Sequence, residues 1–297
     1  MTIGPPQHHI HAAVRAALEE DLAAGDVTTA ALFPEPMRGT GTMRAHQDMV
    51  VAGIAVARMV FEQVDDSLRL FQAVEDGDEV GDGAAVLKIT GDARSILMGE
   101  RVALNFLQHL SGIATLTARL RQAVRAYGTA ILDTRKTVPG LRALQKWAVR
   151  LGGGLNHRCS LGDGILIKDN HLALLNAQGV SIADACRRAR ERGPHRHRII
   201  VEVHSLQEVH DALRGGADVI LLDNVDPGTV RQAVEAVKGR AIVEVSGGIT
   251  LANAAEMAAA GAQALSIGAL THSAPAANLS LDLTALKSPS RHRRRLK

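Results

Sequence analysis

The second half of the chain contains a regular series of short apolar runs, each ending in polar, charged or glycine residues. From Glu202 onward the residues that end these runs recur at Asp223, Ser246 and Gly268, at spacings of 21, 23 and 22 residues. A fully buried parallel strand reads as a continuous apolar run, and the Ala-rich segments between the runs have helical character. In a barrel of such βα units the functional side chains gather at the C-terminal ends of the strands. The spacing therefore predicts an enzyme of the barrel type, with its site on these residues.

The apolar runs define six expected parallel strands. They cover 131–132, 165–167, 199–201, 219–222, 241–245 and 264–267. Short, glycine-bounded segments in the first third predict antiparallel strands around a helix, and hence an α+β domain. These segments are 40–45, 49–53 and 84–89, with the helix at 54–63.

Three further segments complete the expected elements. A short amphipathic helix is expected at about 11–23. Residues 94–127 have a helical pattern, and the cap residue Ser111 beside the helix breaker Gly112 predicts a break between two helices. Residues 279–286 carry an apolar pattern that is expected to return to the first domain.

Charge and composition limit the partners of the chain. Five positive charges lie within the last seven residues, at Arg291, Arg293, Arg294, Arg295 and Lys297. Without them the formal net charge of +3 becomes −2, so the body of the chain is not basic. Only 2% of the residues are aromatic, which leaves few platforms for stacked bases. We therefore expect no nucleic-acid partner and a solvated, disordered basic tail.

Redox and targeting signals are weak. Cys159 and Cys186 are isolated, so neither a disulfide nor zinc is indicated. No charged-then-apolar leader opens the chain and no apolar stretch reaches membrane-spanning length, which predicts a cytoplasmic protein without a membrane partner. The histidines near the start resemble a metal cluster, but a polar segment before the first helix explains them more simply; they are His8, His9 and His11.

Polar residues at the ends of the runs describe an anionic ligand. A basic set lies within 37 residues and consists of Arg135, Lys136, His157, Arg158, Lys168 and His171. Such a set suits a ligand with several negative charges, such as carboxylates and phosphates. Glu202 and Asp223, from the next two strands, suit Mg²⁺ on a pyrophosphate, sugar hydroxyls or a developing cation.

The last two runs end in glycine-rich segments that suit a phosphate. These are Ser246, Gly247 and Gly248, and then Gly268, each followed by a helix. Glycine lets main-chain N–H groups approach a phosphate, and the following helix N-terminus favours the anion. In (β/α) barrels the phosphate site commonly lies at the late strands.

Simpler interpretations exist for several of these residues. Arg101 fits a solvated helix residue with a local partner, and residues 152–154 fit a flexible glycine loop better than a dinucleotide fingerprint. His157 and Arg158 fit polar loop residues, and His272 fits a helix cap. Asp133 fits a structural residue that orients Arg135 or Lys136.

The motifs resemble those of the quinolinate phosphoribosyltransferase family over nearly the whole chain. Residues 19–22, 25–29 and 100–115 are similar to the opening and the central helix of the family. The densest part of the signature comprises 133–137, 139–142, 152–154, 157–158 and 166–171. It continues in order through 201–203, 221–224, 246–249 and 266–268.

The resemblance implies a fold and a reaction. It implies an α/β fold with an N-terminal α+β sandwich domain at 1–112, joined by about 276–288, and an incomplete (β/α) barrel at 113–275. This barrel is that of the type II phosphoribosyltransferases, and 289–297 would form the basic, disordered tail. The implied reaction uses Mg²⁺ and transfers the phosphoribosyl group of phosphoribosyl pyrophosphate to quinolinate with decarboxylation. Its products are nicotinate mononucleotide, pyrophosphate and CO₂, in NAD biosynthesis.

The resemblance also implies residue roles and a homodimer or hexamer with shared active sites. The residues implied to bind quinolinate are Arg135, His157, Arg158 and Lys168, with Arg101 entering the site of a neighbouring subunit. Lys136 would lie between quinolinate and the phosphoribosyl donor, and His171 is expected to bind substrate. Glu202 and Asp223 would face the ribose and the Mg²⁺-pyrophosphate. The 5-phosphate side would be formed by Ser246, Gly247, Gly248, Gly268 and His272.

Two departures and three rival functions remain. Ile200 and His204 stand where the family often has acidic residues, which loosens any statement about metal geometry. Nicotinate phosphoribosyltransferase is a close rival, but nicotinate has only one carboxylate for the basic set. A molybdenum-transport-associated binding protein of the same fold is disfavoured by the intact motifs. An aldolase with Lys168 as Schiff base is disfavoured because a lysine among other cations fits an ion-pair donor better.

Overall fold

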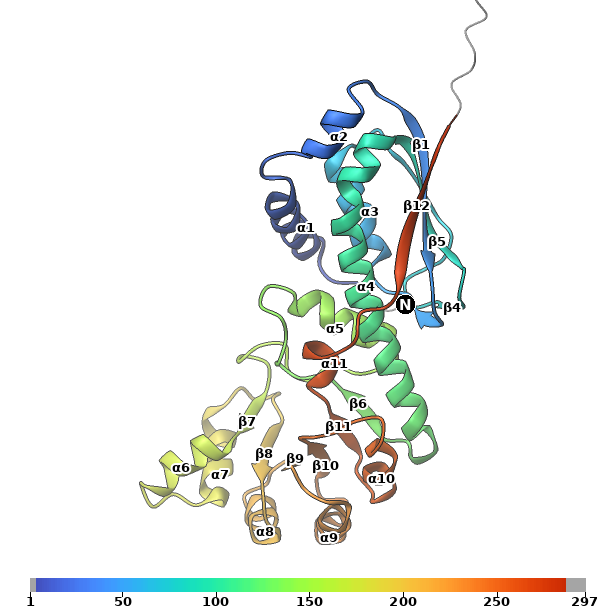
Figure 1. Cartoon of the computed structure of the whole chain (residues 1–297). Helices are drawn as coiled ribbons and strands as arrows, with labels where there is room; N and C mark the ends of the chain where they lie inside the picture. The colour runs from blue at the N-terminus through green and yellow to red at the C-terminus, as the bar shows by residue number, and fades with distance from the viewer. Residues whose placement is uncertain (1–3, 287–297) are drawn as a thin grey trace, which may run out of the picture. The chain divides into compact units, whose positions relative to one another are not determined.

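A computed structural model describes residues 4–286, which form two compact units (Figure 1). One unit contains the residues up to Thr115 together with those from Pro275, and the other is Leu116–Ala274. The tail predicted to be basic and disordered, 289–297, lies outside the described residues. None of the helices within 4–286 is both long and apolar enough to cross a membrane.

The first unit is built on a four-stranded antiparallel sheet in the order β12-β1-β5-β3. These strands are β1 (Arg38–Ala45), β3 (Arg69–Gln72), β5 (Ala85–Asp92) and β12 (Leu279–Ala285). The last strand pairs with the first, with Ala45 opposite Leu279 and Gly39 opposite Ala285, so the apolar segment near the chain end does return to this unit. A small second sheet joins β2 (Met49–Val50) to β4 (Glu79–Val80).

Helices accompany the four-stranded sheet of the first unit, and the first of them packs on the third. They are α1 (Gln7–Leu22), α2 (Val27–Leu32), α3 (Ile54–Val64) and α4 (Ala93–Val124), the last of which extends into the second unit. The contact of α4 with β1 is close, because a Cβ on Gly41 would lie 3.0 Å from Ile96. The α+β character predicted for this part of the chain is confirmed.

The predicted break at Ser111 and Gly112 is wrong, because α4 is continuous through both residues. The Ser111 hydroxyl receives a hydrogen bond from the Ala52 main-chain N–H (2.9 Å) and donates to the Ala52 carbonyl (3.1 Å). A Cβ on Gly112 would collide with the Pro275 carbonyl oxygen. Glycine at this position lets the main chain at Pro275 approach the helix closely, which outweighs the low helix propensity of glycine.

The second unit is an open parallel sheet with helices outside it, which is the expected incomplete barrel. Its strand order is β6-β11-β10-β9-β8-β7. The strands are β6 (Ala130–Leu132), β7 (Ile165–Ile167), β8 (Ile199–Val203), β9 (Val219–Asp223), β10 (Ile242–Ser246) and β11 (Ala264–Ser266). All six coincide with predicted apolar runs to within two residues at each end.

The connecting segments of this unit are mostly helical. A short 3-10 helix, Arg125–Tyr127, precedes β6. The helices are α5 (Arg142–Leu151), α6 (Asp169–Asn176), α7 (Ile182–Arg192), α8 (Leu206–Arg214), α9 (Pro227–Val237), α10 (Ala254–Ala259) and α11 (Ala269–His272).

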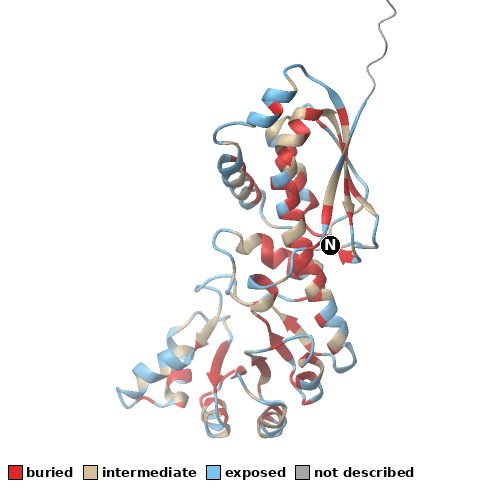
Figure 2. Cartoon of the chain, in the orientation of Figure 1, coloured by how far each residue is buried: buried red, intermediate tan, exposed pale blue. Residues whose placement is uncertain are grey.

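The inner face of the barrel is largely apolar. Ile200, Val219 and Leu221 form a buried cluster on which Leu166 and Ile242 pack. The central strands β8 and β9 are almost entirely buried, as Figure 2 shows, which explains their continuous apolar runs in the sequence. Since side chains alternate along a strand, acidic residues two positions after Ile200 and Leu221 share the inner face with them.

Candidate active site

The C-terminal ends of all six parallel strands carry residues predicted for the site. In sheet order they are Arg135 and Lys136 after β6, Gly268 and His272 after β11, Ser246–Gly248 at β10, Asp223 at β9, Glu202 in β8, and Lys168 and His171 after β7. The ends of neighbouring parallel strands meet at one edge of a sheet. The fold therefore brings these residues to the same rim of the second unit.

Lys168 and Glu202 form an ion pair between neighbouring strands. Lys168 Nζ lies 3.2 Å from Glu202 Oε2, and the carboxylate is 9% exposed whereas the lysine side chain is 48% exposed. His171 has a local task as well, because its Nδ1 accepts the Lys168 main-chain N–H at 3.0 Å at the start of α6. The lysine is thus held at the rim by a buried carboxylate while one side stays open to solvent.

The glycine-rich turn after β10 lies against the end of β9. Asp223 is opposite Ser246 in the register, and the Asn224 main-chain N–H donates to the Ser246 carbonyl at 2.9 Å. Gly247 has a φ of +83°, and a Cβ there would collide with the Asn224 side chain. Only glycine fits this position, because both the φ value and the space exclude a side chain.

Gly268 lies between two other predicted residues. A Cβ on Gly268 would be 3.0 Å from both Lys136 Cδ and His272 Nε2. The Thr271 hydroxyl donates to the Lys136 carbonyl at 2.7 Å and so ties the segment after β6 to α11. The structure thus brings Lys136, Gly268 and His272 together.

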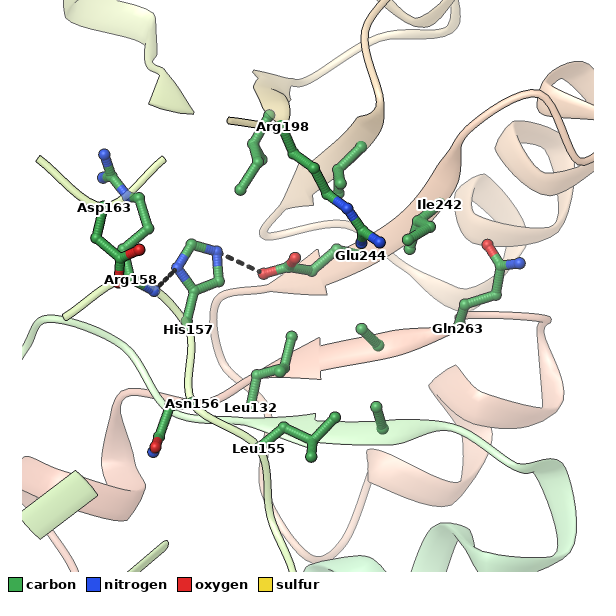
Figure 3. A pocket seen from close by; sticks show the side chains of 14 residues that line it. Leu132, Leu155, Asn156, His157, Arg158, Asp163, Arg198, Ile242, Glu244 and Gln263 are labelled. Carbon is green, nitrogen blue, oxygen red and sulfur yellow. Dashed lines mark hydrogen bonds and ion pairs between the residues drawn. The ribbon is translucent and has the colours of Figure 1, made fainter. Parts of the chain in front are cut away.

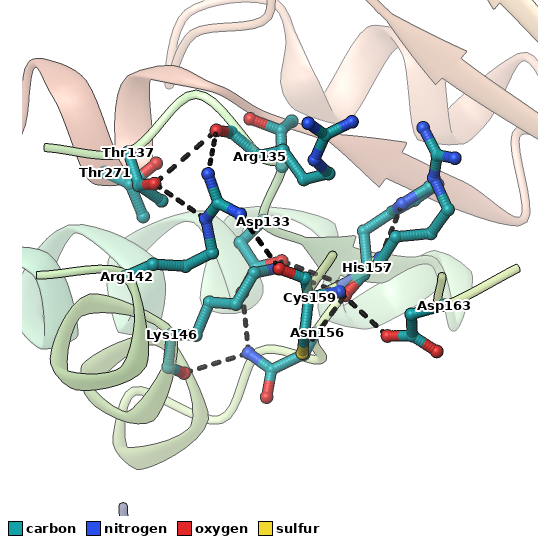
Figure 4. A network of polar contacts seen from close by, with 12 residues as sticks. Asp133, Arg135, Thr137, Arg142, Lys146, Asn156, His157, Cys159, Asp163 and Thr271 are labelled. Atoms are coloured by element: carbon teal, nitrogen blue, oxygen red, sulfur yellow. Dashed lines mark hydrogen bonds and ion pairs between the residues drawn. The ribbon is translucent and has the colours of Figure 1, made fainter. Parts of the chain in front are cut away.

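A buried network centred on Asp133 supports the segment that bears His157 (Figure 4). The Asp133 carboxylate pairs with Lys146 Nζ and accepts hydrogen bonds from Asn156 Nδ2 (2.6 Å) and the His157 main-chain N–H (2.8 Å). Burial raises the pKa of the Asp133 carboxyl, and the Lys146 ammonium partly offsets this effect. Asp133 is structural, as expected, but it holds His157 rather than Arg135 or Lys136.

Sequence reasoning missed Lys146 and Asn156. Lys146 is 4% exposed in the middle of the helix α5, where it stands next to Trp147 in the sequence. No local pattern marks it as a buried ion-pair partner. Its role depends on a contact with the strand end at Asp133, which only the fold reveals.

Arg135 and Arg158 each have a buried guanidinium nitrogen, Nε, without a hydrogen-bond partner among residues 4–286, although Arg158 Nη1 donates to the Gly164 carbonyl at 3.4 Å. The pKa of Arg158 is lowered by burial and, next, by the positive charge of Arg135. Two like charges held together with unused donors need an anion between or beside them.

A cavity of about 500 Å³ lies on the inner side of this region (Figure 3). Of the predicted residues, His157 and Arg158 line it, together with apolar side chains such as Leu132, Ile200 and Ile242. Glu244 also lines it and was not predicted, although a charged residue inside the apolar run 241–245 is a visible signal in the sequence. From the basic set, therefore, only His157 and Arg158 line the cavity.

His157 does not contribute the positive charge expected of it. Its pKa is lowered to about 4, first by burial and then by the charges of Arg158 and Lys146. At neutral pH the imidazole is therefore uncharged, and the cationic part of the set consists of arginine and lysine side chains. Burial also raises the pKa of Glu244 to about 7, with the nearby Ser266 hydroxyl opposing it.

Two predictions remain without a geometric counterpart. Arg101 is exposed on α4 in the first unit, and its entry into a neighbour's site stays a prediction. Within the described residues no group of three or more His, Cys, Asp or Glu side chains is arranged to hold a metal ion. Any metal at Glu202 and Asp223 would need further ligands from the substrate.

Comparison with known proteins identifies the family. The model of the quinolinate phosphoribosyl transferase C-terminal domain matches residues 113–282, and that of the N-terminal domain matches residues 26–111. A nicotinate-nucleotide pyrophosphorylase (carboxylating) of Mycobacterium leprae is 44% identical over 276 residues, covering 91% of this chain and 95% of its own length. A probable enzyme of the same name from Bacillus subtilis is 40% identical over 268 residues, covering 89% and 90%.

Solved structures agree with the sequence comparison. The structure of the nicotinate-nucleotide pyrophosphorylase from Francisella tularensis superposes with a TM-score of 0.88 at 36% identity, covering 94% of this chain and 97% of that one. The two family models together account for most of the chain, including both units. The chain belongs to the quinolinate phosphoribosyltransferase family.

Proposed function

We propose that the chain transfers the phosphoribosyl group of phosphoribosyl pyrophosphate to quinolinate and releases CO₂, forming nicotinate mononucleotide and pyrophosphate. The observation that carries the proposal is the pair of guanidinium groups, Arg135 and Arg158, whose buried Nε atoms lack partners among residues 4–286. Quinolinate has two adjacent carboxylates, which match such a pair of donors. The names of the relatives point to the same reaction.

Different cations at the rim would bind different parts of quinolinate. Arg135 and Arg158 would each hold a carboxylate, and Lys168 would add a third positive charge from β7. His157, which is neutral, would contribute shape and hydrogen bonding rather than charge. With the carboxylates fixed, the ring nitrogen is directed at C1 of the sugar, and this orientation supplies much of the rate enhancement.

Glu202 and Asp223 would stabilise the sugar as it gains positive charge. Departure of pyrophosphate leaves an oxocarbenium-like C1, and Glu202 is 7% exposed, so its charge acts in a poorly screened environment. The Lys168 ammonium, 3.2 Å away, holds the Glu202 carboxylate in position in the absence of substrate. Lys136 and the glycine-rich turns after β10 and β11, with Ser246, Gly247, Gly248, Gly268 and His272, would bind the phosphate groups.

The two acidic residues also suit Mg²⁺. They lie on the same face of neighbouring strands, and Mg²⁺ is usually held by one or two carboxylates together with substrate phosphates. Mg²⁺ would offset charge on the departing pyrophosphate. Ile200, in place of an acidic residue, belongs to the apolar core, which leaves Glu202 and Asp223 as the carboxylates of this face in β8 and β9.

Decarboxylation follows from the chemistry of the ring. After the bond to C1 forms, the ring nitrogen is positively charged and accepts the electron pair of the breaking C–CO₂ bond. The protein then has only to orient the carboxylate next to the nitrogen without stabilising it too strongly. Arg135 and Arg158 would orient this carboxylate.

We also infer that the chain forms a homodimer or hexamer in which Arg101 of one subunit completes the site of another. The exposure of Arg101 on α4 supports this inference, since an arginine without a buried local role is free to meet a partner. The cytoplasmic location stays a prediction from the sequence.

A comparison of two substrates tests the proposal. The purified chain is incubated with phosphoribosyl pyrophosphate, Mg²⁺ and either quinolinate or nicotinate, and nucleotide and CO₂ are measured. We expect rapid turnover of quinolinate with CO₂ release and little turnover of nicotinate. Equal rates with nicotinate would favour the nicotinate enzyme, and no turnover of either substrate would favour the binding-protein alternative.

A further inference from the structure

Glu244 is an acidic side chain in the apolar interior of the barrel. It lies in the middle of β10, is 3% exposed, and is opposite Leu221 on one neighbouring strand and Ala264 on the other. It points into the cavity described above (Figure 3). Burial of a carboxyl group costs free energy unless the group has a hydrogen-bond or ion-pair partner, so its presence here needs an explanation.

The partner that Glu244 faces is His157. Glu244 Oε1 lies 3.4 Å from His157 Nε2, and the two side chains are 4% and 11% exposed. This contact is longer than a hydrogen bond, and within the part of the chain that the structure describes neither atom has a hydrogen-bond partner. His157 Nε2 and Glu244 Oε1 therefore face each other with unused hydrogen-bonding capacity, while the Ser266 hydroxyl lies close to the carboxyl group and Arg198 lines the same cavity.

The other ring nitrogen of His157 fixes which atom carries the proton. The Arg158 main-chain N–H donates to His157 Nδ1 at 2.7 Å, and a main-chain amide can only donate. Nδ1 is therefore unprotonated, and the single ring proton is on Nε2, directed at Glu244. An imidazolium would have to break the bond to Arg158. Burial and the positive charges of Arg158 and Lys146 disfavour it further, against the opposing charges of Asp163 and of Glu244 when Glu244 is ionised.

We propose that Glu244 is a positioning residue for quinolinate binding: it holds the His157 ring as the neutral Nε2–H form and so fixes the His157–Arg158 segment. The inference rests on the proposed function, because it concerns the side of the site that would hold quinolinate. Asp133 anchors the main chain of this segment and Glu244 anchors its ring. Because Arg158 is bonded to the same ring, a loose ring would also loosen the guanidinium that pairs with a carboxylate.

The proposal predicts a selective kinetic defect. Glu244→Leu, which removes the acceptor, should raise KM for quinolinate roughly tenfold and leave KM for phosphoribosyl pyrophosphate within about twofold. Glu244→Gln keeps an acceptor for Nε2–H and should raise the quinolinate KM less than about threefold. Glu235→Leu, on the exposed side of α9, is the matched control and should change neither constant.

A double substitution separates positioning from a general structural role. If Glu244 acts through His157, then Glu244→Leu added to His157→Ala should raise the quinolinate KM by less than about a further twofold. Additive effects of the two changes, or an equal rise in KM for both substrates, would overturn the proposal.

Nitrogen-15 NMR of the histidine rings tests the contact without any turnover, with His157 assigned from the His157→Ala spectrum. In the ligand-free wild-type chain at pH 7, His157 should be neutral, with a protected proton on Nε2. Glu244→Gln should keep that proton and Glu244→Leu should lose it; if Leu fails to fold, the Gln spectrum decides. A proton on Nδ1, or an Nε2 proton unchanged in Glu244→Leu, would refute the contact. Absence of quinolinate turnover by the wild type would instead refute the proposed function.

Discussion

Replacing Glu244 by glutamine should change how the free energy of unfolding depends on pH. Burial raises the pKa of the Glu244 carboxyl from 4.5 to about 7 in the folded chain. The folded state therefore binds this proton more tightly than the unfolded state. The stability associated with the group is complete below pH 4.5 and is lost as the pH rises through about 7.

The size of the effect follows from the shift. A difference of about 2.5 pKa units corresponds to roughly 3 kcal/mol, at about 1.4 kcal/mol for each unit. Glutamine is nearly isosteric with the protonated acid and has no charge to bury. Glu244→Gln should thus match the wild type near pH 4 and exceed its unfolding free energy by roughly 3 kcal/mol at pH 8.

Because of His157, the free energy of unfolding should depend little on pH in the wild type and strongly in the Glu244→Gln variant. The pKa of His157 is lowered from 6.5 to about 4. The stability that this group contributes is therefore complete above pH 6.5 and is lost as the pH falls toward 4. In the wild type the contributions of the two groups have opposite slopes between pH 4.5 and 6.5. The glutamine variant retains only the histidine slope, so its stability should rise with pH over this range.

The measurement is urea unfolding followed by circular dichroism at pH values from 4.5 to 8. The exposed Glu235 provides the control, because Glu235→Gln removes a carboxylate without removing a buried one. Wild-type and Glu244→Gln free energies that differ by a constant amount across this range would refute the reasoning. A gain in stability on removing Glu244 would also indicate that the residue is retained for function.

Three further substitutions test other parts of the structure. Asp133→Ala should lower the free energy of unfolding by about 3–5 kcal/mol, because it leaves the Lys146 ammonium buried and unpaired. The control, Glu19→Ala, breaks the exposed pair with Arg15 and should lower it by less than about 1 kcal/mol. Equal losses of stability in urea unfolding would contradict this. Gly112→Ala should cost about 2 kcal/mol or more in the same assay because its Cβ meets the Pro275 carbonyl, and an unchanged midpoint would show that the two segments separate easily. Arg101→Ala and Lys168→Ala should each abolish most activity, while mixed subunits of a dimer should regain roughly a quarter of wild-type activity if the sites are shared; no recovery after verified subunit exchange would return Arg101 to a local role.

The strands and the rim of the barrel could be predicted because their signals are local. Strands buried on both faces have continuous apolar runs, and the residue types at their ends reveal the charge of the ligand. By contrast, β3 and β4 were missed because they are mostly exposed and their sequences lack an apolar run. An exposed strand that buries few side chains has no apolar pattern by which it could be predicted.

The contacts that were missed or wrong depend on residues far apart in the chain. Gly112 looks like a helix breaker until the Pro275 main chain is known to approach it. The pairing of Glu244 with His157 joins the strand β10 to a distant segment, and the pairing of Asp133 with Lys146 depends on how the helix α5 packs. The same holds for the charge of His157, because burial and the neighbouring cations, rather than the residue type, make it neutral.

Quinolinate labelled with carbon-13 in the carboxyl group next to the ring nitrogen provides the most direct test of the proposed reaction. With phosphoribosyl pyrophosphate and Mg²⁺, the chain should release labelled CO₂ in amounts equal to the nucleotide and pyrophosphate formed. Without phosphoribosyl pyrophosphate it should release none, because the ring nitrogen must be bonded to the sugar before it can accept the electrons. Nucleotide that retains the label, or labelled CO₂ released without the phosphoribosyl donor, would contradict the account.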